Sequence, residues 1–176
     1  MSTPRIEPGG LRELGLVNHL IATVAGRVIG GTRPRVFTTL GRQRGLFRAW
    51  LWYSSRMMPG GRLPRTETEL VIVHIATLRE CEYELRHHRR IGRSVGLRPE
   101  QIEHAGQDDW DGYTDREQAL LSAATQYVRD RGIDDPTWDR LRHHLDEAEA
   151  IELLLLCGQY DSLATTLLTL RVQPED

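Results

Sequence analysis

The stretch of sequence that decides the fold runs from Glu69 to Gly96 and reads ELVIVHIATLRECEYELRHHRRIGRSVG. Its first ten residues are apolar nearly all round, which is typical of a helix buried at the centre of a domain. From Cys81 to Val95 the apolar residues instead recur at helical spacing, and Gly96 is suited to a left-handed helix end. We therefore predict two consecutive helices, the first fully buried and the second with one face on the core.

The second of these helices presents three reactive side chains on its packing face. At 100° per residue, Cys81, Glu84 and His88 fall on the apolar side, whereas the arginines fall on the other. Because positions 84 and 88 are four apart, we expect Glu84 and His88 to touch, and the helix dipole to favour a thiolate at Cys81. The pattern predicts an acid–base site, although a structural Glu–His hydrogen bond and a core cysteine would have the same spacing.

The buried helix opens with Thr66-Glu67-Thr68-Glu69, which has the form of a capping box. On this interpretation Thr66 accepts from the backbone amide of Glu69, and the Glu69 carboxyl accepts from the amide of Thr66. Glu69 would then be structural; alternatively, it joins the site as an acid. Cys157, within the apolar run IELLLLCG, is interpreted as a core residue.

The rest of the chain is helical in pattern. Residues 1–10 hold two Pro and two Gly and are expected to form a flexible N-terminal lead-in. Further helices are expected at 11–29, 36–58, from Pro99, at 114–131 with a second capping box at its start, after Pro136, and at 147–170. No alternating strand pattern is present. We predict an all-α chain with a single helical domain over residues 11–176.

Composition excludes several classes of protein. All 23 basic residues are Arg, so no lysine is available for Schiff-base chemistry or for a P-loop. The net charge of -2 gives no reason to expect nucleic acid as a partner. The basic segment Arg86–Arg93 is interpreted as a solvated surface or a subunit contact. Cys81, Glu84 and His88 could ligate zinc, but their spacing matches no familiar zinc pattern, so neither a metal nor another cofactor is predicted.

The cellular compartment is predicted from the lack of a membrane-spanning segment, a signal peptide and a disulfide framework. We find no stretch that approaches the ~20 apolar residues of a membrane span, and the first ten residues lack the regions of a signal peptide. Two cysteines do not form a disulfide framework in a chain of 176 residues. We therefore expect a cytoplasmic protein with no membrane partner.

The stretch quoted first resembles the signature region of the carboxymuconolactone decarboxylase family and its alkylhydroperoxidase D branch. In that branch a Glu precedes a Cys-x-x-Cys by about a dozen residues, and a His follows the second Cys. Glu69, Cys81 and His88 stand at three of these positions, and Glu84 replaces the second Cys. Flanking segments within residues 36–168 also look like family segments. The resemblance implies an alkylhydroperoxidase D-like helical bundle that forms a homo-oligomer, often a trimer or hexamer.

The resemblance also implies a small-molecule substrate. Family peroxidases activate the thiol nearer the His through a His–Glu relay, and that thiol is the one missing here. Our preferred hypothesis is a decarboxylase-like enzyme that acts by acid–base chemistry on a small organic acid or lactone. In it His88 shuttles the proton, Glu84 and Glu69 orient or assist it, and Cys81 lines the pocket or acts as a weak acid.

Two alternatives stay open. The first is an alkylhydroperoxidase- or peroxiredoxin-like antioxidant that uses Cys81 as a single thiol, for which a disulfide cycle would have to recruit Cys157. The second is a non-catalytic helical binding module, in which the Glu84–His88 pair only braces the core.

Overall fold

A computed structural model describes residues 3–28 and 31–175, and over these residues the chain is all-α with no strand, as the sequence predicts. The helices are, in chain order, α1 (Leu11–Val28), α2 (Arg35–Leu40), α3 (Arg44–Met57), α4 (Arg65–Leu78), α5 (Glu82–Ser94), α6 (Pro99–Glu103), α7 (Asp115–Asp130), α8 (Asp135–His144) and α9 (Glu147–Leu170). The predicted end of the first helix, at residue 29, lies outside the described residues.

The helices are distributed over two compact units. The terminal unit comprises Met1–Ser55 and Thr166–Asp176, and it contains α1, α2 and most of α3. The central unit comprises Arg56–Thr165, and it contains α4 to α8 and most of α9. All four predicted site residues belong to the central unit.

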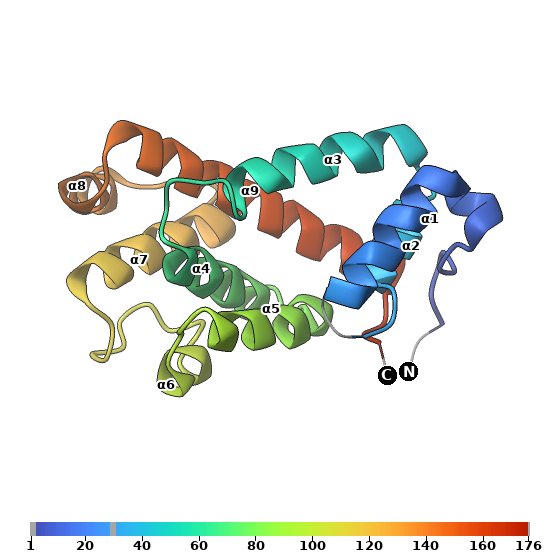
Figure 1. The fold of residues 1–176 in the computed structure, drawn as a ribbon. Helices are drawn as coiled ribbons and strands as arrows, with labels where there is room; N and C mark the ends of the chain where they lie inside the picture. The colour runs from blue at the N-terminus through green and yellow to red at the C-terminus, as the bar shows by residue number, and fades with distance from the viewer. Residues whose placement is uncertain (1–2, 29–30, 176) are drawn as a thin grey trace. The chain divides into compact units, whose positions relative to one another are not determined.

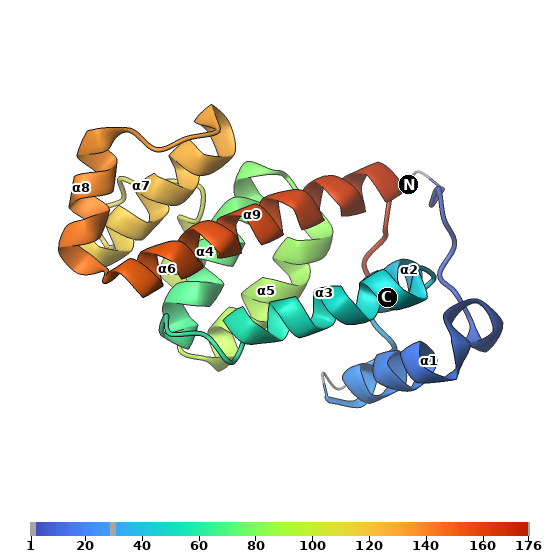
Figure 2. The ribbon, with the colours of Figure 1, turned by 90° about the horizontal axis from the view of Figure 1, so that it is seen from above.

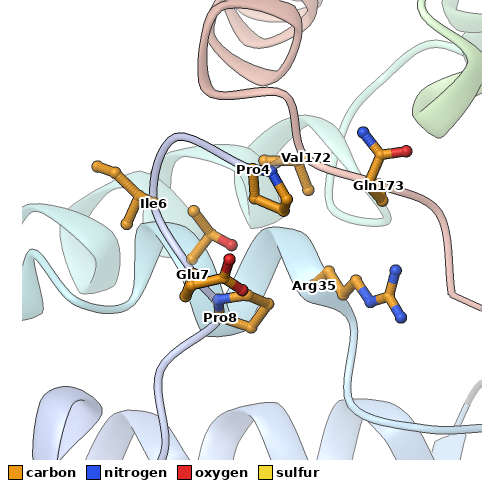
Figure 3. Close-up of a pocket in the computed structure, with 8 residues that line it drawn as sticks. Pro4, Ile6, Glu7, Pro8, Arg35, Val172 and Gln173 are labelled. Carbon is orange, nitrogen blue, oxygen red and sulfur yellow. The ribbon is translucent and has the colours of Figure 1, made fainter. Parts of the chain in front are cut away.

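In the terminal unit the segment that precedes α1 contacts the last residue of α9. The backbone N–H of Arg5 donates to the carbonyl oxygen of Leu170 at 3.0 Å. A pocket of about 300 Å³ lies between the N-terminal segment, α2 and the C-terminal segment (Figure 3). Its lining consists of Pro4, Ile6, Glu7, Pro8, Arg35, Thr39, Val172 and Gln173.

The prediction of one helix over residues 36–58 is wrong, because the chain breaks between α2 and α3. The break follows Gly41, whose backbone N–H donates to the carbonyl oxygen of Phe37 at 2.9 Å. A Cβ atom at Gly41 would lie 2.4 Å from that oxygen and 2.9 Å from Cδ2 of Leu14. Only glycine permits this close approach, so the helix ends where the sequence pattern continues.

In the central unit α4 is the buried helix that the sequence predicts. Every residue from Thr68 to Ala76 is buried. α4 packs against both α5 and α7, and α5 lies beside it in both views (Figures 1 and 2). Burying each large apolar side chain of this run contributes roughly 1.5–3 kcal/mol, so α4 is the main hydrophobic element that holds its neighbours in place.

The predicted capping box at the start of α4 is wrong. The helix begins at Arg65, directly after Pro64, and no side chain caps it. Because Thr66 is already inside the helix, it lacks the extended backbone of an N-cap residue. The Thr68 hydroxyl donates to the carbonyl of Pro64 at 3.2 Å instead, and the Glu69 side chain is left available for another contact.

Other predicted helix ends are confirmed. The backbone N–H of Glu117 donates to the Thr114 hydroxyl at 3.2 Å, and the N–H of Thr114 donates to the Glu117 carboxylate at 2.9 Å, which completes the capping box of α7. Pro99 is the first residue of α6. Gly96 follows α5 with a φ of 102°, the left-handed conformation that favours glycine.

One helix of the described chain, α9, is long and apolar enough to cross a membrane by length and composition. The expectation that no segment reaches this threshold is therefore wrong. Core helices of soluble proteins pass the same test, and 39% of the most apolar window of α9 is buried inside the structure. Its composition is accordingly weak evidence for a membrane span.

Candidate active site

A buried carboxyl–imidazole pair joins α4 to α5. Glu69 is fully buried, and its Oε2 lies 2.7 Å from Nδ1 of His88, whose side chain is 13% exposed. With Nδ1 donating to the carboxylate, Nε2 is the nitrogen that can accept or deliver a proton. The pair therefore has the form of a proton relay with its outer end at the imidazole.

His88 pairs with Glu69 rather than with Glu84, which corrects the expected contact. Glu84 and His88 do lie four residues apart on α5, but Oε2 of Glu84 is buried without a hydrogen-bond partner. α4 packs against α5 and brings the Glu69 carboxylate to the imidazole. His88 therefore contacts Glu69 of the neighbouring helix, and not Glu84 of its own helix as the spacing of four residues predicted.

Arg65 completes the surroundings of Glu69, one turn earlier on α4. Its Nη2 lies 2.6 Å from Oε1 of Glu69, and its side chain is 34% exposed. The guanidinium compensates the negative charge that Glu69 carries into the interior. Nη1 of Arg65 is buried and has no hydrogen-bond partner. Arg65 was not among the residues predicted for the site, although its spacing of four residues from Glu69 was a usable signal.

The Glu84 carboxyl is buried in the first turn of α5. It is 2% exposed, and this burial raises its pKa to about 8 because the charged form loses its hydration. Glu84 is therefore a neutral carboxylic acid at pH 7. The site thus holds two carboxyl groups in different states, Glu69 in an ion pair and Glu84 protonated.

Tyr160 reaches the site from α9, and sequence analysis missed it. Its ring meets the His88 ring edge-on at 5.2 Å between centroids, and its hydroxyl donates to Sδ of Met58 at 3.5 Å. Burial, followed by the negative charges of Glu84 and Glu69, raises the pKa of Tyr160 well above its ordinary value. A tyrosine in an apolar helix is usually interpreted as a core residue. Its hydroxyl nevertheless needs a hydrogen-bond partner when buried, and this requirement could have identified Tyr160 from the sequence.

Neither cysteine has the surroundings of a reactive thiolate. Cys81 is the N-cap of α5 and is buried, and this burial raises its pKa to about 11, more than hydrogen bonds from the Glu84 and Tyr83 amides lower it. The amides at the start of α5 do favour a thiolate, as expected, but burial outweighs their effect. Cys157 is also buried, and its pKa is raised to about 12.

The structure thus brings Glu69 and His88 into direct contact, while Glu84 and Cys81 interact with each other electrostatically at the start of α5. Over residues 3–28 and 31–175, no three His, Cys, Asp or Glu side chains are arranged to hold a metal ion. A second pocket of the central unit, of about 420 Å³, contains none of the four predicted residues. Its lining consists of Thr66, Gly96, Leu97, Arg98, Gln101, Gly112, Tyr113, Thr114 and Glu117.

Comparison with known proteins supports the resemblance seen in the sequence. Residues 44–126 match the model of the carboxymuconolactone decarboxylase family. A search of curated protein sequences finds no match.

Solved structures share the fold at low sequence identity. A peroxidase-related protein from Ralstonia eutropha with an alkylhydroperoxidase AhpD core is 21% identical, with a TM-score of 0.86 over 100% of this chain and 94% of that one. A putative antioxidant defence protein AhpD from Agrobacterium tumefaciens is 20% identical, with a TM-score of 0.68 over 76% and 92%. The debrominase Bmp8, in complex with 2,3,4-tribromopyrrole, is 17% identical, with a TM-score of 0.82 over 99% and 93%. At these identities the likeness shows the fold alone.

Proposed function

Because residues 44–126 match the model of the carboxymuconolactone decarboxylase family and the chain has the alkylhydroperoxidase D-like fold, we propose that it is an enzyme that transfers a proton to or from a small organic acid or lactone. The observation that carries this proposal is the 2.7 Å hydrogen bond between buried Glu69 and His88. A carboxylate on Nδ1 holds the imidazole in one orientation and leaves Nε2 for the substrate.

The proposed step is a decarboxylation. The bond between carbon and the reacting carboxylate breaks, CO₂ leaves, and the electron pair moves into a conjugated carbonyl as an enolate. Protonated His88 gives its Nε2 proton to the carbon and is reprotonated from solvent. Glu69 offsets the charge of the imidazolium throughout. A positioned proton donor of this kind contributes ~10²–10⁴-fold in rate.

The charges around the pair favour an anionic substrate. Nη1 of Arg65 is buried without a partner, and a guanidinium is well suited to bind a carboxylate that does not react. Glu84, which is neutral below about pH 8, adds no negative charge that would repel the substrate. Together Arg65 and Glu84 support a carboxylated lactone or a related small acid.

The alternatives have less support. A single-thiol peroxidase needs a thiolate, whereas burial raises the pKa of Cys81 to about 11, and Glu84 occupies the place of a nearby second thiol. A non-catalytic binding module accounts for the Glu69–His88 pair as a brace. It gives no reason for a buried carboxylic acid with an unpartnered oxygen at Glu84.

The test is turnover of γ-lactones that carry a ring carboxylate and a conjugated carbonyl. CO₂ release measures the reaction, and deuterium from D₂O should appear at the newly protonated carbon by NMR. We expect His88→Gln and Glu69→Gln to lower kcat/KM by about 10²–10⁴-fold. His143→Gln, at an exposed histidine of α8, is the matched control and should retain full activity.

Two outcomes would overturn the proposal. Turnover that His88→Gln leaves unchanged would remove the relay from the reaction. Peroxide consumption that disappears in Cys81→Ser but persists in His88→Gln would favour the single-thiol alternative instead.

We also propose that the chain forms a homo-oligomer. α1 exposes apolar side chains at Leu16, Val17 and Leu20, which are 74%, 54% and 59% exposed and lie at helical spacing. Apolar surface of this kind commonly marks a contact between proteins. Light scattering should find more than one chain per particle, and Leu16→Glu together with Leu20→Glu should reduce the mass to that of a monomer.

A further inference from the structure

Two acidic groups that burial keeps protonated lie beside the Glu69–His88 pair. Glu84 is 2% exposed, and its Oε2 has no hydrogen-bond partner. Tyr160 is 4% exposed, and its hydroxyl donates to the Met58 thioether at 3.5 Å. A thioether sulfur is a weak acceptor, so the hydroxyl can turn to a stronger one. Oε2 of Glu84 thus has no hydrogen-bond partner and the Tyr160 hydroxyl has only a weak acceptor, whereas buried polar groups ordinarily find strong partners.

Three helices bring these groups to one place. Tyr160 of α9 places its ring edge-on against His88 of α5, at a centroid distance of 5.2 Å and an interplanar angle of 90°. Glu69 of α4, and Glu84 once it is ionised, raise the pKa of Tyr160 through their negative charge, so both carboxyl groups lie within electrostatic range of its hydroxyl. The proton relay and the two neutral donors therefore belong to the same site.

We propose that the Tyr160 hydroxyl and the Glu84 carboxylic acid together bind the oxyanion that develops on the substrate when His88 moves its proton. This inference rests on the proposed function and names the partner of the enolate oxygen. A carboxyl kept neutral by an apolar site can donate a hydrogen bond to such an oxygen, and a buried phenol can donate a second. Fixed donors in a site without water typically contribute ~10²–10³-fold in rate each.

This arrangement has a pH limit, because ionised Glu84 would repel an oxyanion. The titratable and charged groups that share the site are Arg65 and Glu69 from α4, Cys81 and His88 from α5, and Tyr160 from α9. Burial raises the pKa values of Cys81 and Tyr160 above that of Glu84, so Glu84 ionises first as the pH rises. Oxyanion binding should then weaken above about pH 8, by about tenfold per pH unit.

The experiment uses 4-nitrophenol, whose anion resembles an enolate in charge and absorbs visible light. The full chain is titrated with it between pH 6 and pH 9, and affinity is expressed per phenolate anion. We expect binding at pH 7 that weakens above about pH 8. Tyr160→Phe should weaken binding at pH 7 by at least about tenfold, because one donor is lost. Tyr53→Phe, in the terminal unit, is the matched control and should bind like the unsubstituted protein.

The Glu84→Gln variant tests most directly whether ionisation of Glu84 causes the pH dependence of binding. The amide remains a neutral donor but cannot ionise, so phenolate binding should persist to pH 9 with an affinity at pH 7 within about threefold of the unsubstituted protein. A purely structural Glu84 would not change the pH profile in this way. Circular dichroism at each pH checks that every variant is folded.

Three results would overturn the inference: no phenolate binding by the folded unsubstituted protein, unchanged affinity in Tyr160→Phe, or the same loss above pH 8 in Glu84→Gln. Failure of the proposed function is distinguishable, because this assay needs no turnover. Lactone decarboxylation that depends on His88, without phenolate binding, would preserve the relay and remove the oxyanion site. Phenolate binding without any such turnover would preserve the oxyanion site and remove the proposed decarboxylation.

Discussion

Two histidines in neighbouring helices, His74 fully buried and His88 half-buried, show how differently the same side chain is used. His74 of α4 is fully buried: its Nε2 lies 2.8 Å from the Thr125 hydroxyl, and its Nδ1 accepts from the backbone N–H of Gly106 at 3.1 Å. His88 of α5 instead pairs its Nδ1 with the Glu69 carboxylate at 2.7 Å.

Both the hydrogen-bond partners and the degree of burial separate the two roles. A backbone N–H that donates to Nδ1 requires that nitrogen to be unprotonated, so His74 is held as one neutral tautomer. Burial in the same place lowers the pKa of His74 to about 4. In His88 the Nδ1 nitrogen faces the Glu69 carboxylate at 2.7 Å, which orients the imidazole and leaves Nε2 for proton exchange with a substrate. The neutral partners and full burial of His74 mark it as a structural residue, whereas the carboxylate partner and partial exposure of His88 make it a catalytic candidate.

The largest expected effect is on stability and concerns His74. His74→Leu would leave the Gly106 N–H and the Thr125 hydroxyl without their partner, at a cost of about 1–3 kcal/mol each, partly offset by the added apolar side chain. We expect the free energy of unfolding in urea to fall by about 3 kcal/mol. His143→Leu, at an exposed position, should change it by no more than about 0.5 kcal/mol. A loss below about 1 kcal/mol in His74→Leu would mean that these hydrogen bonds do not hold the structure.

The next effect is the pH dependence of stability, in which His74 and Glu84 oppose each other. The pKa of His74 falls from 6.5 to about 4 on burial, so its contribution is complete above pH 6.5 and is lost as the pH falls to 4. The pKa of Glu84 rises from 4.5 to about 8, so its contribution is complete below pH 4.5 and is lost as the pH rises to 8. Each slope is about 1.4 kcal/mol per pH unit.

These two slopes cancel between pH 4.5 and 6.5, where both groups differ in protonation between the folded and unfolded chain. We therefore expect stability to be nearly constant over that range and to fall by about 2 kcal/mol between pH 6.5 and 8. In His74→Leu only the ionisation of Glu84 contributes to the pH dependence. The free energy of unfolding should therefore decline from pH 4.5 to pH 8. Urea unfolding at successive pH values measures both curves, and parallel curves would contradict the assignment.

The smallest expected effect is the stability change in His88→Gln. The side chain is partly exposed, and glutamine can still donate to Glu69, so the free energy of unfolding should change by no more than about 1 kcal/mol. Thermal unfolding of the same preparation used for turnover measures it. A loss above about 2 kcal/mol would make His88 resemble His74 and would favour the reading of the Glu69–His88 pair as a brace.

Secondary structure was predictable from the sequence where residues within one short segment determine it. Apolar periodicity predicts α4, α5 and α9, and local capping patterns predict where α6 and α7 begin. The break after Gly41 was not predictable, because it depends on how closely Leu14 approaches. The start of α4 was mistaken because the proline before it outweighs the capping pattern of Thr66 to Glu69.

The sequence by itself determined that the chain is all-α and that Cys81, Glu84 and His88 share one side of α5, because 3.6 residues per turn is a local property of the backbone. Only the tertiary structure decided that His88 contacts Glu69, that Arg65 and Tyr160 join them, and that Glu84 is protonated. Hydrogen-bond partners and pKa values depend on which side chains and how much water surround a group. Helices distant in sequence set those surroundings, and spacing along one helix does not encode them.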